Sequence, residues 1–194
     1  MKTILASKSP RRKEILSTLG VKYECEPADI DESVPEGATP FEAVESICYR
    51  KAFHIAQKYK DKDVLVISAD TVVCLDGKIY GKPQSKEHAI KMLEAFSGTT
   101  HEVLSGFTLI YEGKSVTKSV STKVKFKALD KEEILYYVEN GSPMDKAGAY
   151  GIQEKGSLFV EKIDGDYFNV VGLPVYEIFK TLKEEFGLQF KDLI

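Results

Sequence analysis

The chain has 194 residues, of which 43% are hydrophobic and 29% are charged, as is ordinary for a soluble globular protein. A net charge of -3 at pH 7 argues against a surface that binds a nucleic-acid polymer, although a small basic pocket remains compatible with it. The three cysteines form no CxxC pair, and no apolar run is long enough for a signal peptide or a membrane span. We therefore expect a cytoplasmic protein with reduced thiols and no membrane association.

The first third of the chain alternates between strand and helix patterns. Its clearest helix start is Thr39-Pro40-Phe41-Glu42, which combines a capping residue, a proline at the first helical position and a glutamate at the third. In chain order we predict a strand over 2–6, a helix over 11–19, a strand over 21–26 and a helix from 40 to about 59.

Hairpin signals become frequent after residue 63. Asp76-Gly77 and Glu112-Gly113 each separate two strand-like runs, and Asp164-Gly165-Asp166 is interpreted in the same way. The predicted elements are a strand over 64–67, strands over 72–75 and 78–80, a helix over 85–96, strands over 103–112 and 114–127, a helix from 130, strands over 158–163 and 167–171, and a helix from 174. These elements predict the α/β class, with an elongated, twisted mixed sheet flanked by helices.

One loop between a predicted strand and helix concentrates groups that bind phosphate. Ala6-Ser7-Lys8-Ser9-Pro10-Arg11-Arg12 brings two hydroxyls and three cations to the positive end of a helix. Arginine suits this task because its planar guanidinium grips phosphate oxygens in pairs. Taken alone, such a segment is more often a solvated basic turn with Ser9 as the N-cap of the helix.

Three further segments carry polar groups that suit a phosphate-anhydride hydrolase. Asp70 follows an apolar strand, Lys82 lies between a glycine and a proline in a tight turn, and Asp29-Ile30-Asp31-Glu32 offers carboxylates that could bind magnesium. An Asx turn, an exposed lysine and a solvated acidic loop are the plain alternatives. Together, cations, metal-binding carboxylates and a candidate base make such a hydrolase conceivable.

The chain resembles the Maf family of nucleotide pyrophosphatases nearly from end to end. The resemblance is carried by the segments 6–12, 68–73, 81–83, 96–101, 145–153 and 163–174. It implies the fold shared with inosine-triphosphate pyrophosphatases, with residues 1–194 forming one domain of two lobes and a central cleft, without a clean boundary in the sequence. It also implies a homodimer, a small-molecule nucleotide substrate and a divalent metal, Mg²⁺ or Mn²⁺.

The resemblance further implies roles for individual residues. Asp70 matches the proton acceptor, and Glu32 with Asp70 matches the metal environment. The positions that match phosphate contacts are Ser7, Arg11, Arg12, Lys51 and Lys82, although Lys51 by itself is expected at the surface of its helix. Water would attack the α-phosphorus and release pyrophosphate.

The implied substrates are dTTP and UTP, because the positions that distinguish the pyrimidine branch of the family match Arg12, Thr71 and Gln153. The planar amide of Gln153 offers one donor and one acceptor, which suits the N3–H and O4 edge of uracil or thymine. Modified pyrimidine nucleotides and 7-methyl-GTP remain alternative substrates. A nucleotide-binding regulator of division or septum formation, or a non-catalytic module, is a different class of alternative.

Overall fold

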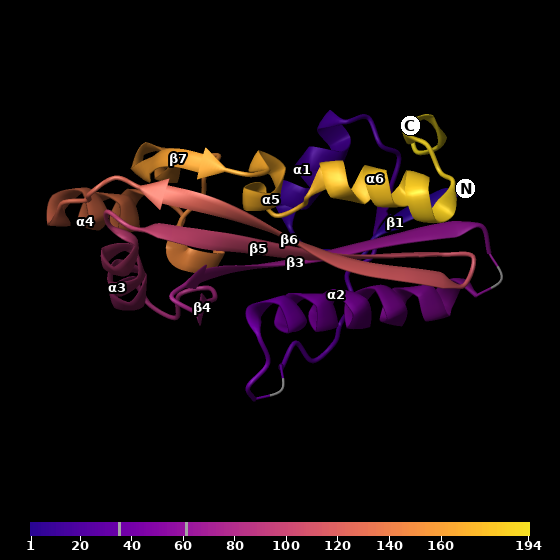
Figure 1. Ribbon diagram of the computed structural model, residues 1–194, viewed down its shortest axis with the longest axis horizontal. Helices are drawn as coiled ribbons and strands as arrows, with labels where there is room; N and C mark the ends of the chain where they lie inside the picture. Colours follow the sequence, from indigo (N-terminus) through magenta and orange to yellow (C-terminus); the bar gives the residue numbers. More distant parts are fainter. Residues whose placement is uncertain (35, 61) are drawn as a thin grey trace. The chain divides into compact units, whose positions relative to one another are not determined.

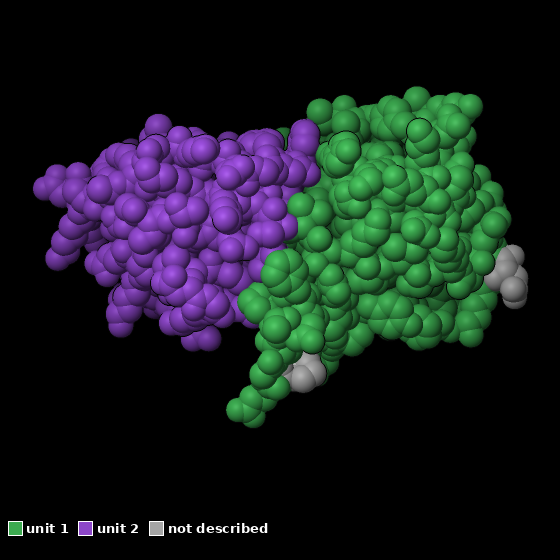
Figure 2. Space-filling view, viewed as in Figure 1, with its two compact units in different colours: residues 1–70, 105–120, 172–194 green, residues 71–104, 121–171 purple. Residues whose placement is uncertain are grey.

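The computed structural model describes residues 1–34, 36–60 and 62–194, and these residues form two compact units. Unit 1 comprises Met1–Asp70, Ser105–Val120 and Gly172–Ile194, and unit 2 comprises Thr71–Leu104 and Ser121–Val171 (Figure 2). The chain passes between the units at residues 70/71, 104/105, 120/121 and 171/172, with no linker segment in the sequence at these points. Among the described residues, no helix combines the length and apolarity needed to cross a membrane.

The strands form a mixed sheet (Figure 1). They are β1 (Lys2–Leu5), β2 (Glu24–Cys25), β3 (Val64–Leu75), β4 (Lys78–Tyr80), β5 (Thr100–Tyr111), β6 (Lys114–Phe126) and β7 (Val160–Asp164). Hydrogen bonding orders them β2-β1-β3-β5-β6-β7, and β4 pairs with β3. β1 runs parallel to both β2 and β3, whereas β4 and β7 are antiparallel to their partners, so the predicted mixed sheet with flanking helices is confirmed.

Capping residues mark the start of several helices. The helices are α1 (Pro10–Thr18), α2 (Pro40–Ala56), α3 (Lys86–Phe96), α4 (Lys131–Asn140), α5 (Tyr167–Val171) and α6 (Val175–Phe186), with 3₁₀ turns at Gln57–Tyr59, Ala147–Ala149, Lys155–Phe159 and Phe190–Asp192. Thr39 and Glu42 form the predicted capping box of α2, and Asp130 and Glu133 form that of α4. Each box satisfies backbone N–H groups that the first helical turn leaves unpaired.

In unit 1, helices cover both faces of the long strands. The neighbouring β6 residues Lys118 and Ser119 contact Glu177 of α6 and Glu45 of α2, respectively. Because successive strand residues point to opposite faces, α6 and α2 lie on opposite sides of the strands, as Figure 1 also shows. Gly106 of β5 lets α2 approach closely, since a Cβ there would lie 3.0 Å from the Val44 carbonyl.

Two predictions near the site residues are wrong. The sequence predicts separate strands before and after Asp70, but β3 continues through it from Val64 to Leu75. The strand can continue because polar side chains on this face have partners: Ser68 donates to the Cys48 carbonyl and Asp70 accepts from Lys51. Residues 167–171, predicted as the second strand of a hairpin, form the short helix α5 instead, and the Asp166 carboxylate accepts from the Phe168 N–H at its start.

The core of unit 2 contains a histidine. His101 is 1% exposed, its Nε2 lies 2.8 Å from the Tyr150 hydroxyl, and its ring lies against Phe96 and Phe126. Desolvation lowers the pKa of His101 to about 4, because the charged imidazolium is disfavoured among aromatic rings. The folded protein therefore keeps this side chain neutral at pH values where an exposed histidine is protonated.

We expect His101 to make the protein less stable as the pH falls. The unfolded chain binds this proton below a pKa of about 6.5, whereas the folded chain binds it only near 4, so stability is fully present above 6.5 and is lost as the pH falls through this window. The loss amounts to about 3 kcal/mol by pH 4. Urea unfolding of the wild type and of His101→Phe between pH 4 and 7.5 measures this loss. If the unfolding free energy changes equally with pH in both proteins, the prediction is contradicted.

Candidate active site

The face of β3 that looks toward α2 carries the central polar contacts of unit 1. Ser68 and Asp70 lie two residues apart on the strand and therefore point to the same side. Opposite them stand Cys48 and Lys51, which share one face of α2 because they are three residues apart. The Ser68 hydroxyl donates to the Cys48 carbonyl at 2.7 Å, and the Lys51 ammonium donates to Asp70 Oδ1 at 2.9 Å. Helix α2 thus places the Lys51 ammonium against the Asp70 carboxylate.

Lys51 joins two carboxylates that are distant in the sequence. Its Nζ lies 2.9 Å from Glu32 Oε1 and 2.9 Å from Asp70 Oδ1. The Lys51 side chain is 11% exposed and that of Asp70 18%, whereas Glu32 is more open at 55%. The sequence-based expectation of a surface lysine is therefore wrong, because the long side chain of Lys51 reaches inward between the two acids.

Arg50 holds the loop that carries Glu32, a role that sequence reasoning missed. Its guanidinium donates to the carbonyls of Asp31 and Ser33, the residues on either side of Glu32, with Nη2 lying 2.7 Å from the Ser33 oxygen. Arg50 and Lys51 therefore fix the backbone and the side chain of the same short segment. These contacts span 17 and 19 positions, and no local pattern in the sequence indicates them.

The start of α1 supplies hydroxyl and guanidinium groups to unit 1. Ser7 is 6% exposed, and its Oγ accepts from the Ser9 N–H and from Arg12 Nη1 at 3.2 and 3.1 Å. Arg12 Nε also donates to the Gly172 carbonyl at 2.8 Å, which fixes the guanidinium from the far end of the chain. Arg11 precedes it in the first helical turn and is partly buried.

Electrostatics link Arg12 with the carboxylate cluster. Burial lowers the pKa of Arg12, and the negative charges of Asp70 and Glu32 oppose that effect. Burial and the Asp70 charge raise the pKa of the Cys48 thiol, so this sulfur stays neutral between the helix and the strand. Five of the predicted residues thus lie in unit 1 as two contact groups, Ser7 with Arg12 and Lys51 with Glu32 and Asp70, and the carboxylate charges of the second group act on the guanidinium of the first.

The donor set of this cluster fits a divalent metal. Two carboxylate oxygens lie within 2.9 Å of one cationic atom, so Glu32 and Asp70 can already share a positive ion. Magnesium in phosphate-transfer sites takes one or two carboxylates and completes its shell with water and phosphate oxygens. Across residues 1–34, 36–60 and 62–194 there is no group of three or more His, Cys, Asp or Glu side chains that could hold a metal without such added ligands.

Apart from Arg11, which also belongs to unit 1, the remaining predicted residues, Thr71, Lys82 and Gln153, belong to unit 2. Thr71 follows Asp70 on β3, while Lys82 and Gln153 are exposed in two loops. These loops are tied together, because the Gly148 N–H donates to the Gly81 carbonyl at 3.1 Å. Gly148 has a φ of 70°, and a Cβ at this position would lie 2.9 Å from Val73 Cγ2 on β3. Glycine is thus required where the 145–154 segment packs against the strand that carries Thr71.

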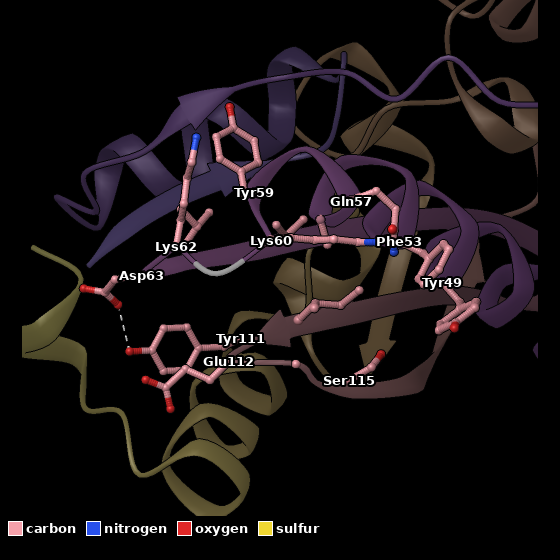
Figure 3. Close-up of a pocket in the computed structure, with 15 residues that line it drawn as sticks. Tyr49, Phe53, Gln57, Tyr59, Lys60, Lys62, Asp63, Tyr111, Glu112 and Ser115 are labelled. Atoms are coloured by element: carbon pink, nitrogen blue, oxygen red, sulfur yellow. Dashed lines mark hydrogen bonds between the residues drawn. The ribbon is translucent and has the colours of Figure 1, made fainter.

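A separate pocket of about 670 Å³ opens in unit 1 beside the C-terminal half of α2 (Figure 3). Strand residues Val64, Val66 and Ile110 contribute to its lining together with the rings of Phe53 and Tyr111. Among the described residues that line it, none belongs to the cluster around Asp70. This pocket is therefore not the candidate active site.

A family model described as "Maf-like protein" matches residues 2–185. The chain belongs to the Maf family. Three similar Maf relatives each bear the name dTTP/UTP pyrophosphatase. The relative from Thermosipho africanus is 48% identical, and the match covers 94% of this chain and 92% of the relative. The relative from Acetivibrio thermocellus is 47% identical over 97% of this chain and 96% of its own length. The relative from Bacillus pumilus is 48% identical over 95% of this chain and 96% of its own length.

A solved structure supports the fold of this Maf protein. The Staphylococcus aureus Ham1 protein superposes with a TM-score of 0.52 over 95% of this chain and 100% of its own, at 15% sequence identity. Because so low an identity carries no information about chemistry, this likeness bears on the fold alone.

Proposed function

We propose that this chain hydrolyses dTTP and UTP to the nucleoside monophosphate and pyrophosphate. The observation that carries the proposal is 47–48% identity, over nearly the full length of both chains, to three proteins named dTTP/UTP pyrophosphatase. The polar cluster of unit 1 supports it, because it combines a carboxylate, a buried lysine and a partly buried arginine, as phosphate-anhydride hydrolysis requires.

In the proposed reaction, Asp70 accepts a proton from the water that attacks the α-phosphorus. The water oxygen forms a bond to this phosphorus, and the bond from the phosphorus to the oxygen bridging to the β-phosphate breaks. Pyrophosphate leaves with the bonding electron pair. Ser7, Arg11, Arg12, Lys51 and Lys82 bind phosphate oxygens and neutralise the charge that develops on the leaving group.

Glu32 and Asp70 would hold the Mg²⁺ or Mn²⁺ ion in this proposal. When bound, a divalent ion polarises phosphoryl oxygens and neutralises part of their charge. Arg50 contributes by fixing the carbonyls on either side of Glu32, which limits the positions that its carboxylate can adopt. We also propose that residues 1–194 act as one catalytic domain and that the protein is a cytoplasmic homodimer.

The test is to identify the products formed by the pure protein. Incubation with dTTP, UTP, the other nucleoside triphosphates, modified pyrimidine nucleotides and 7-methyl-GTP, each with Mg²⁺ or Mn²⁺, is expected to yield monophosphate and pyrophosphate fastest from dTTP and UTP. Formation of diphosphate and orthophosphate contradicts the proposed bond cleavage. Fastest turnover of 7-methyl-GTP contradicts the proposed substrate.

Base selection is assigned to Arg12, Thr71 and Gln153, and Gln153 gives the most direct prediction. Replacing Gln153 by alanine removes the amide that pairs with the N3–H and O4 edge of the base, while the groups that act on the phosphates stay in place. We expect kcat/KM for dTTP relative to dCTP to fall about tenfold, mainly through a higher KM. An unchanged ratio excludes this role for Gln153.

A further inference from the structure

A lysine in unit 2 is buried although the proposed reaction does not use it. The side chain of Lys146 is 4% exposed, in a segment of small and aromatic residues that runs to Tyr150. An ammonium group is costly to remove from water unless it is paired and hydrogen-bonded. A lysine at this position therefore requires partners that hold its charge.

Three oxygens surround the Lys146 ammonium. The Ser142 carbonyl and Asp145 Oδ1 each lie 2.7 Å from Nζ, and Glu154 Oε1 lies 3.2 Å from it. Because an ammonium group has three N–H donors, these acceptors match its capacity. The acceptors come from both ends of the 142–154 segment, so one cation ties the two ends of the loop together.

The aliphatic part of Lys146 also determines the shape of the loop. A Cβ at Gly151 would lie 2.5 Å from Lys146 Cε, so the lysine stem fills the space that a side chain at residue 151 would need. The Gly151 N–H pairs with the Tyr137 hydroxyl at 3.2 Å, and the Glu154 N–H donates to the Gly151 carbonyl at 3.2 Å. Lys146 thus contacts the turn at its first residue and at its last.

Gln153 lies inside that turn, directly before Glu154, and its side chain is exposed. We propose that Lys146 is a positioning residue for base recognition, which acts by fixing the 151–154 turn so that Gln153 meets the base in one orientation. This inference rests on the proposed function. It explains why the position holds a charged side chain, because an apolar side chain could fill the same space but could not tie Glu154 to Ser142.

The test is a double-mutant cycle between Lys146→Met and Gln153→Ala. Methionine keeps much of the aliphatic stem beside Gly151 and removes the charge. We expect Lys146→Met to lower the kcat/KM ratio of dTTP to dCTP about tenfold, through a higher KM for dTTP with kcat within about twofold. In the Gln153→Ala background, the same substitution is expected to change the ratio less than about twofold, because the residue through which Lys146 acts is absent.

A purely structural role gives a different result. If Lys146→Met lowers kcat/KM equally for both nucleotides, or lowers the ratio as much without Gln153 as with it, the inference is overturned. Lys155→Met is the matched control, since this nearby lysine contacts the Asn140 carbonyl from an exposed position and should leave the ratio unchanged. If Lys146→Met fails to fold, Glu154→Gln tests the same ion pair with the same expected and contradictory outcomes.

The wild-type protein separates the two proposals. Failure of the wild type to release pyrophosphate from dTTP or UTP contradicts the proposed function itself. Pyrophosphate release by the wild type, a reduced ratio in Gln153→Ala and an unchanged ratio in Lys146→Met leave the function intact and overturn the positioning role alone.

Discussion

Replacing Asp70 by asparagine is expected to leave a folded protein whose turnover of dTTP and UTP falls by about a thousandfold or more. Asparagine has nearly the same size as aspartate, but its amide cannot accept a proton from the attacking water. Lys51 keeps its second partner, Glu32, at 2.9 Å, so the ammonium is not left without an anion. Steady-state kinetics and a thermal melt of the same preparation measure the two effects.

Glu45→Gln provides the matched control for this experiment. Glu45 lies on α2 and pairs with Ser119, outside the cluster around Asp70. The same acid-to-amide exchange is expected to leave kcat within about twofold at this position. If Asp70→Asn retains more than about a tenth of the wild-type rate, Asp70 is not the proton acceptor.

Replacing Lys51 by methionine is expected to lower kcat about a hundredfold and to tighten divalent-metal binding about tenfold. The loss of rate follows because one of the cations proposed to bind phosphate is removed. The gain in affinity follows because Lys51 Nζ lies 2.9 Å from both carboxylates and competes with any ion that binds the same oxygens. We also expect a loss of about 2 kcal/mol in unfolding free energy, which is moderate because Glu32 is largely open to solvent.

A titration with Mn²⁺ in the absence of nucleotide, monitored by calorimetry or paramagnetic resonance, measures the metal affinity separately from the activity. Lys58→Met is a suitable comparison, because Lys58 pairs with Glu26 away from the cluster and should leave Mn²⁺ affinity unchanged. Weaker Mn²⁺ binding by Lys51→Met contradicts the view that the ammonium and the metal share the same two carboxylates.

Local signals in the sequence predict much of the fold correctly. The capping pair Thr39 and Glu42 marks the start of α2, and Glu112-Gly113 marks the turn between β5 and β6 with φ values of 48° and 77°. Both features depend on a few adjacent residues. The continuity of β3 through Asp70 depends instead on Lys51, 19 positions away, whose ammonium makes a carboxylate acceptable within a buried strand.

The candidate site also combines residues that the sequence predicts with residues that depend on distant contacts. The resemblance to known proteins predicts its members, because the chemistry of each segment alone is also compatible with a plain surface loop. Arg50 has no signal of its own, since its acceptors are backbone carbonyls of a distant loop. Lys146 does have one: it follows Asp145 directly and precedes the uncharged segment 147–153. Such a charge indicates either a surface position or a buried ion pair, and the sequence does not distinguish them.

If Gln153 recognises the base as proposed, the turn from Gly151 to Gly156 restricts how base preference can evolve. A Cβ on Gly156 would lie 2.7 Å from the Gly151 carbonyl oxygen, and a Cβ on Gly151 would lie 2.5 Å from Lys146 Cε, so a side chain at either position would require its neighbour to move. Insertions or bulkier residues would therefore disrupt the segment before they altered selectivity. New nucleotide preferences should arise through exchanges at the outward-facing position 153, which makes it the first site to randomise when engineering this scaffold.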